Sequence, residues 1–255
     1  MGLEKERKPK QLYQLLPENV VAPSSWLSEK GYSPQLLHKY VNSGWLQRVG
    51  RGAYLLANST ITWQSVVLGL QKSKKSGFHV GGLTALNLQG FAHHLPLGEE
   101  QQITLYGEGK VPNWIKQIHS THTFSFFKKP NLGDLGITTY NTGIRELQID
   151  ISTPERAIFE LLYLVEKHEG ITFTFAAEIF ENLTTLRSKL LNQLLQTCQN
   201  IRVKRLFLFF ADHYNFAWAK YLDTQNLNLG SGKMQIVRNG KFDKKYRITI
   251  PKDFQ

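Results

Sequence analysis

The sequence has little of what disulfides and membrane spans require. Its 255 residues include a single cysteine, Cys198, so no disulfide can form within the chain. No apolar run approaches the roughly 20 residues of a membrane-spanning helix, and the N-terminal stretch EKERKPK lacks the apolar core of a secretion signal. We therefore predict a cytoplasmic protein that does not engage a membrane, with Cys198 buried as a small apolar side chain.

Motifs of enzymes and metal sites are also missing. The chain contains no Gly-x-Ser-x-Gly elbow, no HExxH pair and no zinc-finger spacing. Neither His93-His94 nor the pair His119 and His122 is accompanied by further ligands at metal-site spacing. The stretch GSGK at 230–233 resembles the end of a phosphate-binding loop, but a methionine follows where that loop needs Ser or Thr. We predict no catalytic residue, no cofactor and no metal site, and a simple turn at 230–233.

Positive charge, in contrast, is in excess and unevenly placed. The formal net charge is +11. Residues 1–60 carry 8 Lys/Arg against 4 Asp/Glu, residues 61–199 carry 12 against 12, and residues 200–255 carry 11 against 4. Many basic proteins are basic for solubility alone, yet two basic regions around a neutral middle favour a polyanionic partner.

Residues 31–56 carry the most informative pattern. Ser33 is a favourable N-cap and Pro34 a favourable first helical residue, while Gly44 is suited to end the helix. Apolar residues at helical spacing form one side of this helix: Leu36, Leu37, Tyr40 and Val41. Polar residues form the other side: Gln35, His38, Lys39 and Asn42.

A basic hairpin follows that helix. Two strands surround a Gly50-Arg51-Gly52 turn, with Arg48 close by. Two further helices are predicted upstream, from about Lys10 to residue 16 and over residues 23–30. This order predicts a winged helix-turn-helix whose helix from residue 34 to 43 enters a major groove of DNA.

The remaining chain reads as a mixture of helices and strands. Helices over 62–71 and 81–89 are expected to pack on the winged helix and complete an N-terminal domain of residues 1–97. Strands are predicted at 102–107, 123–129, 136–141 and 147–152, then helices at 153–167, 174–182, 185–198 and 203–214, and a closing hairpin at 234–250 turning at Asn239-Gly240. We therefore predict an α+β protein, with a mixed α/β domain over residues 98–255.

Two local patterns in this second domain suggest ordinary surface chemistry. Ser152 and Glu155 have the spacing of a capping box, and Arg156 and Glu160 have the spacing of an exposed i, i+4 ion pair. Farther on, Lys204 and Arg205 begin the strongly apolar stretch 203–210, which favours a buried helix with solvated cations at its start over a stacking platform for single-stranded nucleic acid. Four cations crowd the closing hairpin, where they are candidates to face a polyanion: Lys241, Lys244, Lys245 and Arg247.

Several stretches recur in the same order in a known protein family: LLHKYVNSGWLQRVGRGAYLL (36–56) and STPERAIFELL (152–162), together with 79–98, 181–223 and 229–251. Through these stretches, which span nearly the whole chain, the sequence resembles the AbiEi antitoxins of type IV toxin–antitoxin systems that carry an N-terminal winged helix. The resemblance implies a protein that binds inverted repeats in its promoter and represses its own operon. It also implies a C-terminal domain that counters a nucleotidyltransferase-like toxin without a stable complex.

The resemblance assigns DNA-facing roles to particular residues. Ser33, Gln35, His38, Lys39 and Asn42 would face the groove, and Arg48 and Arg51 of the wing would meet phosphates or a minor groove. The basic C-terminal residues Lys204, Arg205, Lys241, Lys244 and Lys245 would extend that surface. Two alternatives remain open. One is a nucleic-acid-processing enzyme using Asp134, Glu146 and Asp150; the other is a stand-alone regulator or protein-binding module without a toxin.

Overall fold

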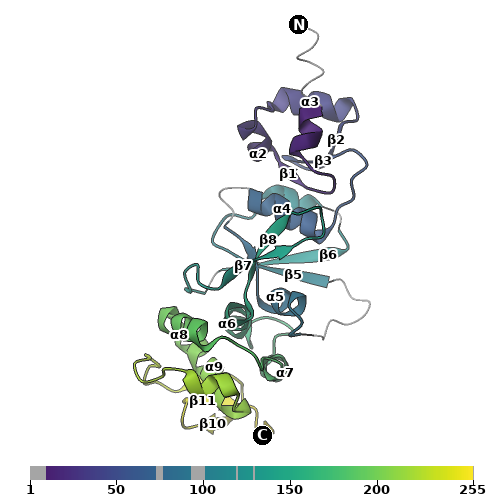
Figure 1. Cartoon of the computed structure of the whole chain (residues 1–255). Coiled ribbons are helices and arrows are strands. Elements are labelled where there is room, and N and C mark those ends of the chain that lie inside the picture. Colours follow the sequence, from purple (N-terminus) through teal and green to yellow (C-terminus); the bar gives the residue numbers. More distant parts are fainter. Residues whose placement is uncertain (1–9, 73–76, 93–100, 119, 129, 255) are drawn as a thin grey trace.

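The computed structural model describes residues 10–72, 77–92, 101–118, 120–128 and 130–254. Three groups of elements follow one another along the long axis of Figure 1. A small helical unit with a three-stranded sheet lies at the N-terminal end, a five-stranded sheet in the middle, and a helical layer with a second three-stranded sheet at the C-terminal end. The predicted α+β class is confirmed.

The N-terminal unit has the element order of a winged helix-turn-helix. Its first helix covers residues 10–15. The elements that follow are β1 (Ala22–Pro23), α2 (Ser24–Glu29), α3 (Pro34–Asn42), β2 (Leu46–Gly50) and β3 (Ala53–Leu56). The strands form an antiparallel sheet in the order β1-β3-β2. The sequence predicted the helices and the β2–β3 wing but not β1, because two residues are too few to show a strand period.

Local chemistry sets the ends of α3. The hydroxyl oxygen of Ser33 accepts a hydrogen bond from the Leu36 amide at 3.3 Å, and Pro34 occupies the first turn. Gly44 has a φ of +70°, which a side chain disfavours, so the chain leaves the helix there and enters β2. The predicted cap, first residue and terminator are all confirmed.

The five-stranded sheet joins both halves of the sequence. It consists of β4 (His79–Val80), β5 (Gln101–Tyr106), β6 (His122–Phe127), β7 (Ile137–Asn141) and β8 (Gln148–Ser152). The strand order is β6-β5-β4-β8-β7, with β5–β6 and β4–β8 parallel and the other two pairs antiparallel. The last four strands match their predicted positions. The central strand β4, however, comes from residues before 97, so the sheet draws on both sides of that boundary.

Helices cover both faces of this sheet. On one face, α4 (Trp63–Lys72) shares a core with the winged helix. On the other, α5 (Gly82–Leu88) packs against α6 (Pro154–Leu164), and Ala85 and Leu86 belong to the core of the C-terminal helices. The expectation that α5 packs on the winged helix is therefore wrong. The chain passes through β4 between α4 and α5, and in Figure 1 these two helices lie on opposite sides of the sheet.

The C-terminal layer contains a hairpin with a different turn from the predicted one. The helices are α7 (Phe173–Glu181), α8 (Ser188–Thr197), α9 (Ile201–Tyr214) and the short η2 (Ala217–Tyr221), and the strands are β9 (Met234–Gln235), β10 (Lys241–Asp243) and β11 (Ile248–Ile250). β10 and β11 pair as a hairpin that turns at 244–247, while β9 runs parallel to β11. The predicted hairpin across Asn239-Gly240 is wrong in its strand pairing: the chain does turn at 238–239 and reverses between β9 and β10, but these two strands do not pair, because β11 lies between them.

Candidate nucleic-acid interface

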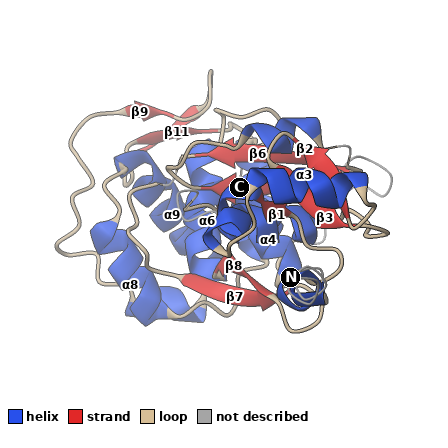
Figure 2. Cartoon of the chain, turned by 90° about the horizontal axis from the view of Figure 1, so that it is seen from above, coloured by secondary structure: helices blue, strands red, loops and turns tan. Residues whose placement is uncertain are grey.

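One side of α3 is buried and the other is free to meet a partner. The side chains of Leu37 and Tyr40 are 0% and 5% exposed and anchor the helix in the core of the winged helix. The residues predicted to face DNA are all exposed: Ser33, Gln35, His38, Lys39 and Asn42. In the end-on view of Figure 2, α3 lies at the end of the molecule that faces the viewer. The structure therefore brings these five predicted residues onto one accessible helix.

Two polar side chains of that exposed side are ordered relative to each other. The amide nitrogen Nδ2 of Asn42 lies 3.3 Å from Nε2 of His38, one helical turn away. Amide and imidazole groups both donate and accept hydrogen bonds, which is the chemistry that reads base edges in the major groove. The pair thus presents a partly preorganised polar surface.

The wing carries two exposed arginines in different settings. The Nη2 of Arg48 donates to the hydroxyl of Tyr54 at 3.4 Å, and its guanidinium lies 5.8 Å from the centre of that ring. Arg51 sits at the tip of the wing with an exposed side chain. Both predicted wing cations are therefore available to a polyanion, and Arg48 is additionally oriented by Tyr54.

The tip of the wing is held on two sides. The carbonyl of Gly52 accepts a hydrogen bond from the Ser24 amide at 2.8 Å, and the Arg51 amide donates to Oε1 of Gln117 at 2.6 Å. Gln117 belongs to a short helix, η1 (Asn113–Gln117), that precedes β6. The wing is therefore a fixed platform between α2 and η1.

Lys204 and Arg205 are buried, so the DNA-facing role that the resemblance implied for them is wrong. Their exposed fractions are 5% and 2%, because α9 is buried around its first turns by the C-terminal core. The guanidinium of Arg205 donates to three carbonyls of the 229–232 turn, those of Leu229, Gly230 and Gly232, at 2.6, 2.9 and 2.7 Å. Arg205 thus holds the turn predicted at 230–233.

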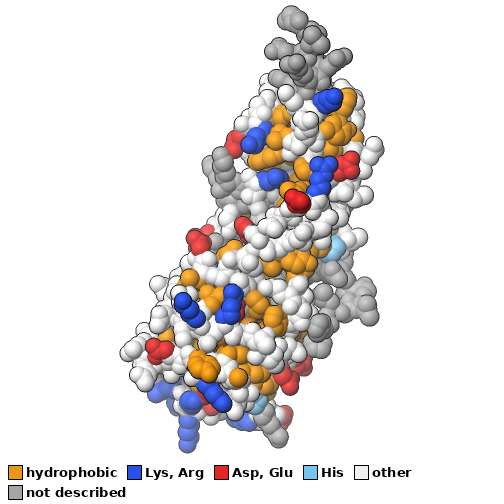
Figure 3. All heavy atoms as spheres, in the orientation of Figure 1, with side chains coloured by type: hydrophobic (Ala, Val, Ile, Leu, Met, Phe, Trp, Pro, Cys, Tyr) orange, Lys and Arg blue, Asp and Glu red, His pale blue; other side chains and the backbone are white. Residues whose placement is uncertain are grey.

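The exposed lysines of the last hairpin lie far from α3. Lys241 donates to the carbonyl of Phe254 at 2.6 Å, Lys245 pairs with Asp212, and Lys244 is exposed in the turn. Lys and Arg side chains gather at the lower end of Figure 3, where Figure 1 shows β10 and β11, opposite the winged helix. These lysines therefore do not extend the surface formed by α3 and the wing.

A buried charge cluster stands where the sequence suggested surface chemistry. Oε1 of Glu160 lies 2.8 Å from both Nε of Arg156 and Nε2 of His79, and Oε2 accepts hydrogen bonds from the Ser152 hydroxyl at 2.7 Å and the Gly82 amide at 3.0 Å. The side chains of Arg156 and Glu160 are both 0% exposed. The cluster joins β4, β8, α5 and α6, so it is a structural tie across the centre of the fold.

Both local predictions for residues 152–160 are therefore wrong. Ser152 binds Glu160 and does not cap α6, and Glu155 forms a two-pronged ion pair with Arg187 at 2.9 Å. Arg156 and Glu160 are not a surface pair, because α6 is buried around its whole circumference. One signal was present in the sequence: the residues between and around the pair are almost all apolar, as in a helix without an exposed side.

The hydrogen-bond and charge partners of Glu160 affect the pKa of its carboxyl group more than its burial does. Burial by itself raises the pKa of a carboxyl group, but the charges and hydrogen bonds of His79, Arg156 and Ser152 lower the pKa of Glu160 below its ordinary value. The carboxylate is therefore ionised at neutral pH, and its charge is compensated inside the protein.

The carboxylates considered for a metal-dependent enzyme are not gathered into a site. Asp134, Glu146 and Asp150 are all exposed, on the loop before β7, the β7–β8 turn and β8. Within the described ranges, no group of three or more His, Cys, Asp or Glu side chains is placed to hold a metal ion. His93, His94 and His119 lie outside the described residues.

Cys198 is 1% exposed, as predicted, and burial raises the pKa of its thiol. No helix of the described chain is long and apolar enough to cross a bilayer.

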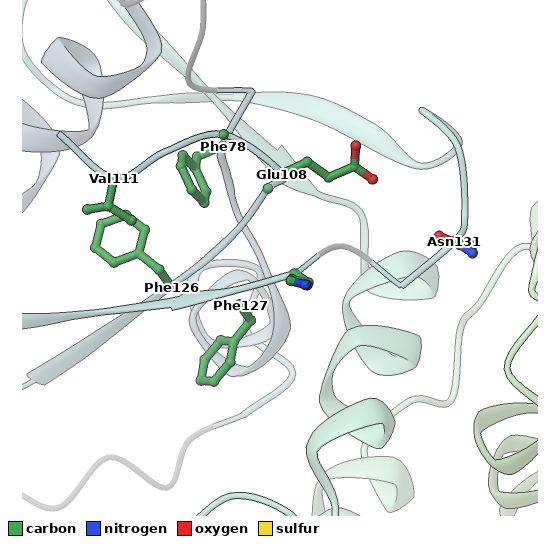
Figure 4. Close-up of a pocket in the computed structure, with 9 residues that line it drawn as sticks. Phe78, Glu108, Val111, Phe126, Phe127 and Asn131 are labelled. Carbon is green, nitrogen blue, oxygen red and sulfur yellow. The ribbon is translucent and has the colours of Figure 1, made fainter.

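Two neighbouring hollows flank β6. One, of about 470 Å³, is drawn in Figure 4, where Phe78, Val111 and Phe126 lie close together while the carboxylate of Glu108 points away from them, toward the segment of Asn131. The second, of about 620 Å³, lies between η1 and β6 and shares Val111 and Phe126 with the first. The sequence predicted neither hollow, because each is lined by segments that are far apart in the chain or that meet only when η1 packs beside the sheet.

Comparison with known proteins divides the chain into two matched regions. A model described as "Transcriptional regulator, AbiEi antitoxin N-terminal domain" matches residues 5–97, and one described as "Transcriptional regulator, AbiEi antitoxin, Type IV TA system" matches residues 100–251. Among solved structures, the RV2827C protein from Mycobacterium tuberculosis is similar in fold, with a TM-score of 0.57 at 12% sequence identity, over 95% of this chain and 89% of that one. The comparison with curated proteins returned no significant match.

Proposed function

Because the chain belongs to the AbiEi antitoxin family of transcriptional regulators of type IV toxin–antitoxin systems, we propose that it is a cytoplasmic DNA-binding repressor of its own operon. In this proposal α3 enters the major groove of an inverted repeat upstream of the gene. The same protein counters a nucleotidyltransferase-like toxin through its C-terminal region, without forming a stable complex with it.

The exposed polar side of α3 is the observation that carries the DNA-binding half. A helix anchored by Leu37 and Tyr40 leaves amide, imidazole and ammonium groups free at the end of the molecule. Base pairs present distinct patterns of donors and acceptors in the major groove, which such groups can read. The neighbouring wing cations supply phosphate contacts, which fix the orientation of the protein but carry no sequence information.

Binding of the full chain to its own upstream region tests this half. Fluorescence anisotropy with a duplex from that region and a shuffled duplex of equal length gives the ratio of the two affinities at a stated salt concentration. We expect the upstream duplex to bind at least about a thousandfold more tightly, the lower end of the range for specific regulators. Equal affinity for both duplexes would refute the repressor assignment.

Co-expression tests the antitoxin half. The gene beside this one is expressed alone and together with this protein, and growth and co-elution in size-exclusion chromatography are measured. We expect the neighbour to inhibit growth, this protein to restore it, and the two to elute separately. A stoichiometric complex would favour a protein-binding module instead, and a neighbour without toxicity would leave a stand-alone regulator.

Cleavage of DNA or RNA by the purified chain with a divalent metal would instead indicate a nucleic-acid-processing enzyme.

A further inference from the structure

The wing tip and η1 form one continuous surface. Gly50 packs so closely on η1 that a Cβ at this position would lie 2.9 Å from the carbonyl oxygen of Trp114. One residue along, the amide of Arg51 is bound to the side chain of Gln117. Whatever approaches the side chain of Arg51 therefore also approaches the exposed residues of η1, and the two cannot separate without breaking these contacts.

Two exposed lysines belong to this surface. Lys116 lies in η1, directly before Gln117, and Lys110 lies on the loop that leads to η1; both line the hollow of about 620 Å³ beside β6. No Asp or Glu is among the described residues that line this hollow. In the described part of the chain neither lysine forms an ion pair, whereas Lys245 at the other end of the molecule pairs with Asp212. The charge next to the wing tip is thus uncompensated within the described chain.

The C-terminal lysines cannot serve this part of the interface. They lie at the opposite end of the molecule from α3, and Lys204 and Arg205 are buried. Lys116, in contrast, lies on η1, which contacts the wing tip directly, and Lys110 lies on the loop that leads to η1. Because η1 is held against the wing tip, the backbone that carries Lys116 is already ordered, and binding a phosphate costs the conformational freedom of the side chain alone.

We propose that Lys116, assisted by Lys110, binds the phosphate backbone of the same duplex that α3 and the wing engage, beside the phosphate contacted by Arg51. This inference rests on the proposed function, since it extends the same DNA surface. A phosphate contact is independent of sequence, so it strengthens binding to every duplex and steepens the dependence on salt.

Salt titration of single variants of the full chain tests the proposal. The logarithm of the binding constant for the upstream duplex is measured against the logarithm of salt concentration for wild type, Lys116→Ala, Lys116→Arg and Arg51→Ala. The slope is negative, and the loss of one phosphate contact makes it less steep by about 0.9. At 0.1 M salt this corresponds to a loss of up to roughly tenfold in affinity. We expect this change for Lys116→Ala and for Arg51→Ala, and the wild-type slope for Lys116→Arg.

A matched control distinguishes a contact from a general effect of charge. Lys189 is exposed on α8 in the C-terminal layer, and Lys189→Ala removes the same charge from a distant surface. We expect it to keep the wild-type slope. If Lys116→Ala also keeps that slope while Arg51→Ala loses part of it, the role of η1 is overturned and the wing contact stands. If the wild-type protein shows no salt-dependent binding at all, the proposed function fails together with this inference. A Lys116→Ala protein that binds DNA normally but no longer suppresses the toxin would overturn the DNA role in favour of a protein partner.

Discussion

The guanidinium Nε of Arg156 lies 2.8 Å from Oε1 of Glu160, and both side chains are completely excluded from solvent. Two opposite charges in this setting stabilise the fold only as a pair, because removing one leaves the other buried without compensation. His79 shares the same carboxylate oxygen, so loss of Glu160 would strand partners on α6 and on β4 at once.

Glu160→Gln should therefore destabilise the protein strongly. We expect a loss of about 3–5 kcal/mol in the free energy of unfolding, the range found when one partner of a buried ion pair is removed. Urea denaturation followed by circular dichroism measures it. Glu178→Gln, at an exposed position of α7, is the control and should change stability by less than about 0.5 kcal/mol. Equal effects of the two substitutions would contradict a special role for the buried cluster.

The same cluster predicts how stability depends on pH. Since the pKa of Glu160 is lowered in the folded protein from its ordinary value of 4.5, the unfolded chain binds a proton more readily there than the folded one. The contribution of Glu160 is thus complete above the unfolded pKa and is lost as pH falls toward the folded pKa. We expect the gap in unfolding free energy between wild type and Glu160→Gln to narrow in acid. Urea denaturation of both proteins at several pH values below 6 measures this difference in unfolding free energy. A difference that stays constant down to pH 3 would show that the pKa of Glu160 is not lowered by folding.

Arg205→Met should affect stability and leave DNA binding intact. The substitution keeps much of the apolar part of the side chain but leaves three carbonyl oxygens of the 229–232 turn without their hydrogen-bond donor. We expect the free energy of unfolding to fall by at least about 2 kcal/mol. Lys244→Met, in the exposed turn of the last hairpin, should change thermal stability little. Thermal unfolding and anisotropy with the upstream duplex give both readouts. A weaker affinity of folded Arg205→Met for DNA, at unchanged structure, would restore this residue to the interface.

Substitutions on α3 and on the wing should have different signatures. Gln35→Ala is expected to relax selectivity at one base position, and Arg51→Ala to weaken binding to all duplexes, each by about 1–3 kcal/mol. Competition binding with a set of single-base operator variants separates the two effects. If Gln35→Ala weakened every duplex equally, this residue would contact the backbone and not a base edge.

The contact between the wing and η1 can be tested with one methyl group. A Cβ at Gly50 would meet Trp114 at 2.9–3.1 Å, so Gly50→Ala should cost about 1–3 kcal/mol by overpacking. Gly232 has open space around its Cβ position and no positive φ, and Gly232→Ala is therefore the matched control. Chemical denaturation of both variants decides; a neutral Gly50→Ala would mean that the wing tip moves freely away from η1.

Signals within short windows of sequence predicted most elements. Ser33, Pro34 and Gly44 marked the ends of α3, and alternating apolar residues marked β5, β6, β7 and β8. The wrong predictions for the charged residues of the C-terminal half have another cause, since their surroundings depend on residues distant in the chain. The partner of Glu160 on β4 lies 81 positions away, and the acceptors of Arg205 in the 229–232 turn lie 24 to 27 positions away. The apolar residues around Arg156 and Glu160 indicate an enclosed helix, but nothing adjacent in the sequence reveals the distant partners of these charges.

In the candidate nucleic-acid interface, too, local sequence patterns predicted some features and missed those that depend on distant residues. Helical spacing alone was enough to separate the anchored side of α3 from its exposed side. Counting cations was not enough to locate the second basic surface, because charge density along the chain does not distinguish Lys244 in an open turn from Arg205 in a core. It also missed Lys116, which stands alone in its stretch of sequence and gains its significance from the wing that packs beside it.

The two-residue strand β4 has a consequence for anyone who wishes to study the halves separately. A protein cut near residue 97 would give a C-terminal fragment without the middle strand of its own sheet and without His79, and an N-terminal fragment whose β4 has no partners. Inactivity of either fragment would then report a broken sheet and say nothing about where repression or toxin control resides. Assigning those activities to parts of the molecule calls for point substitutions in the intact chain.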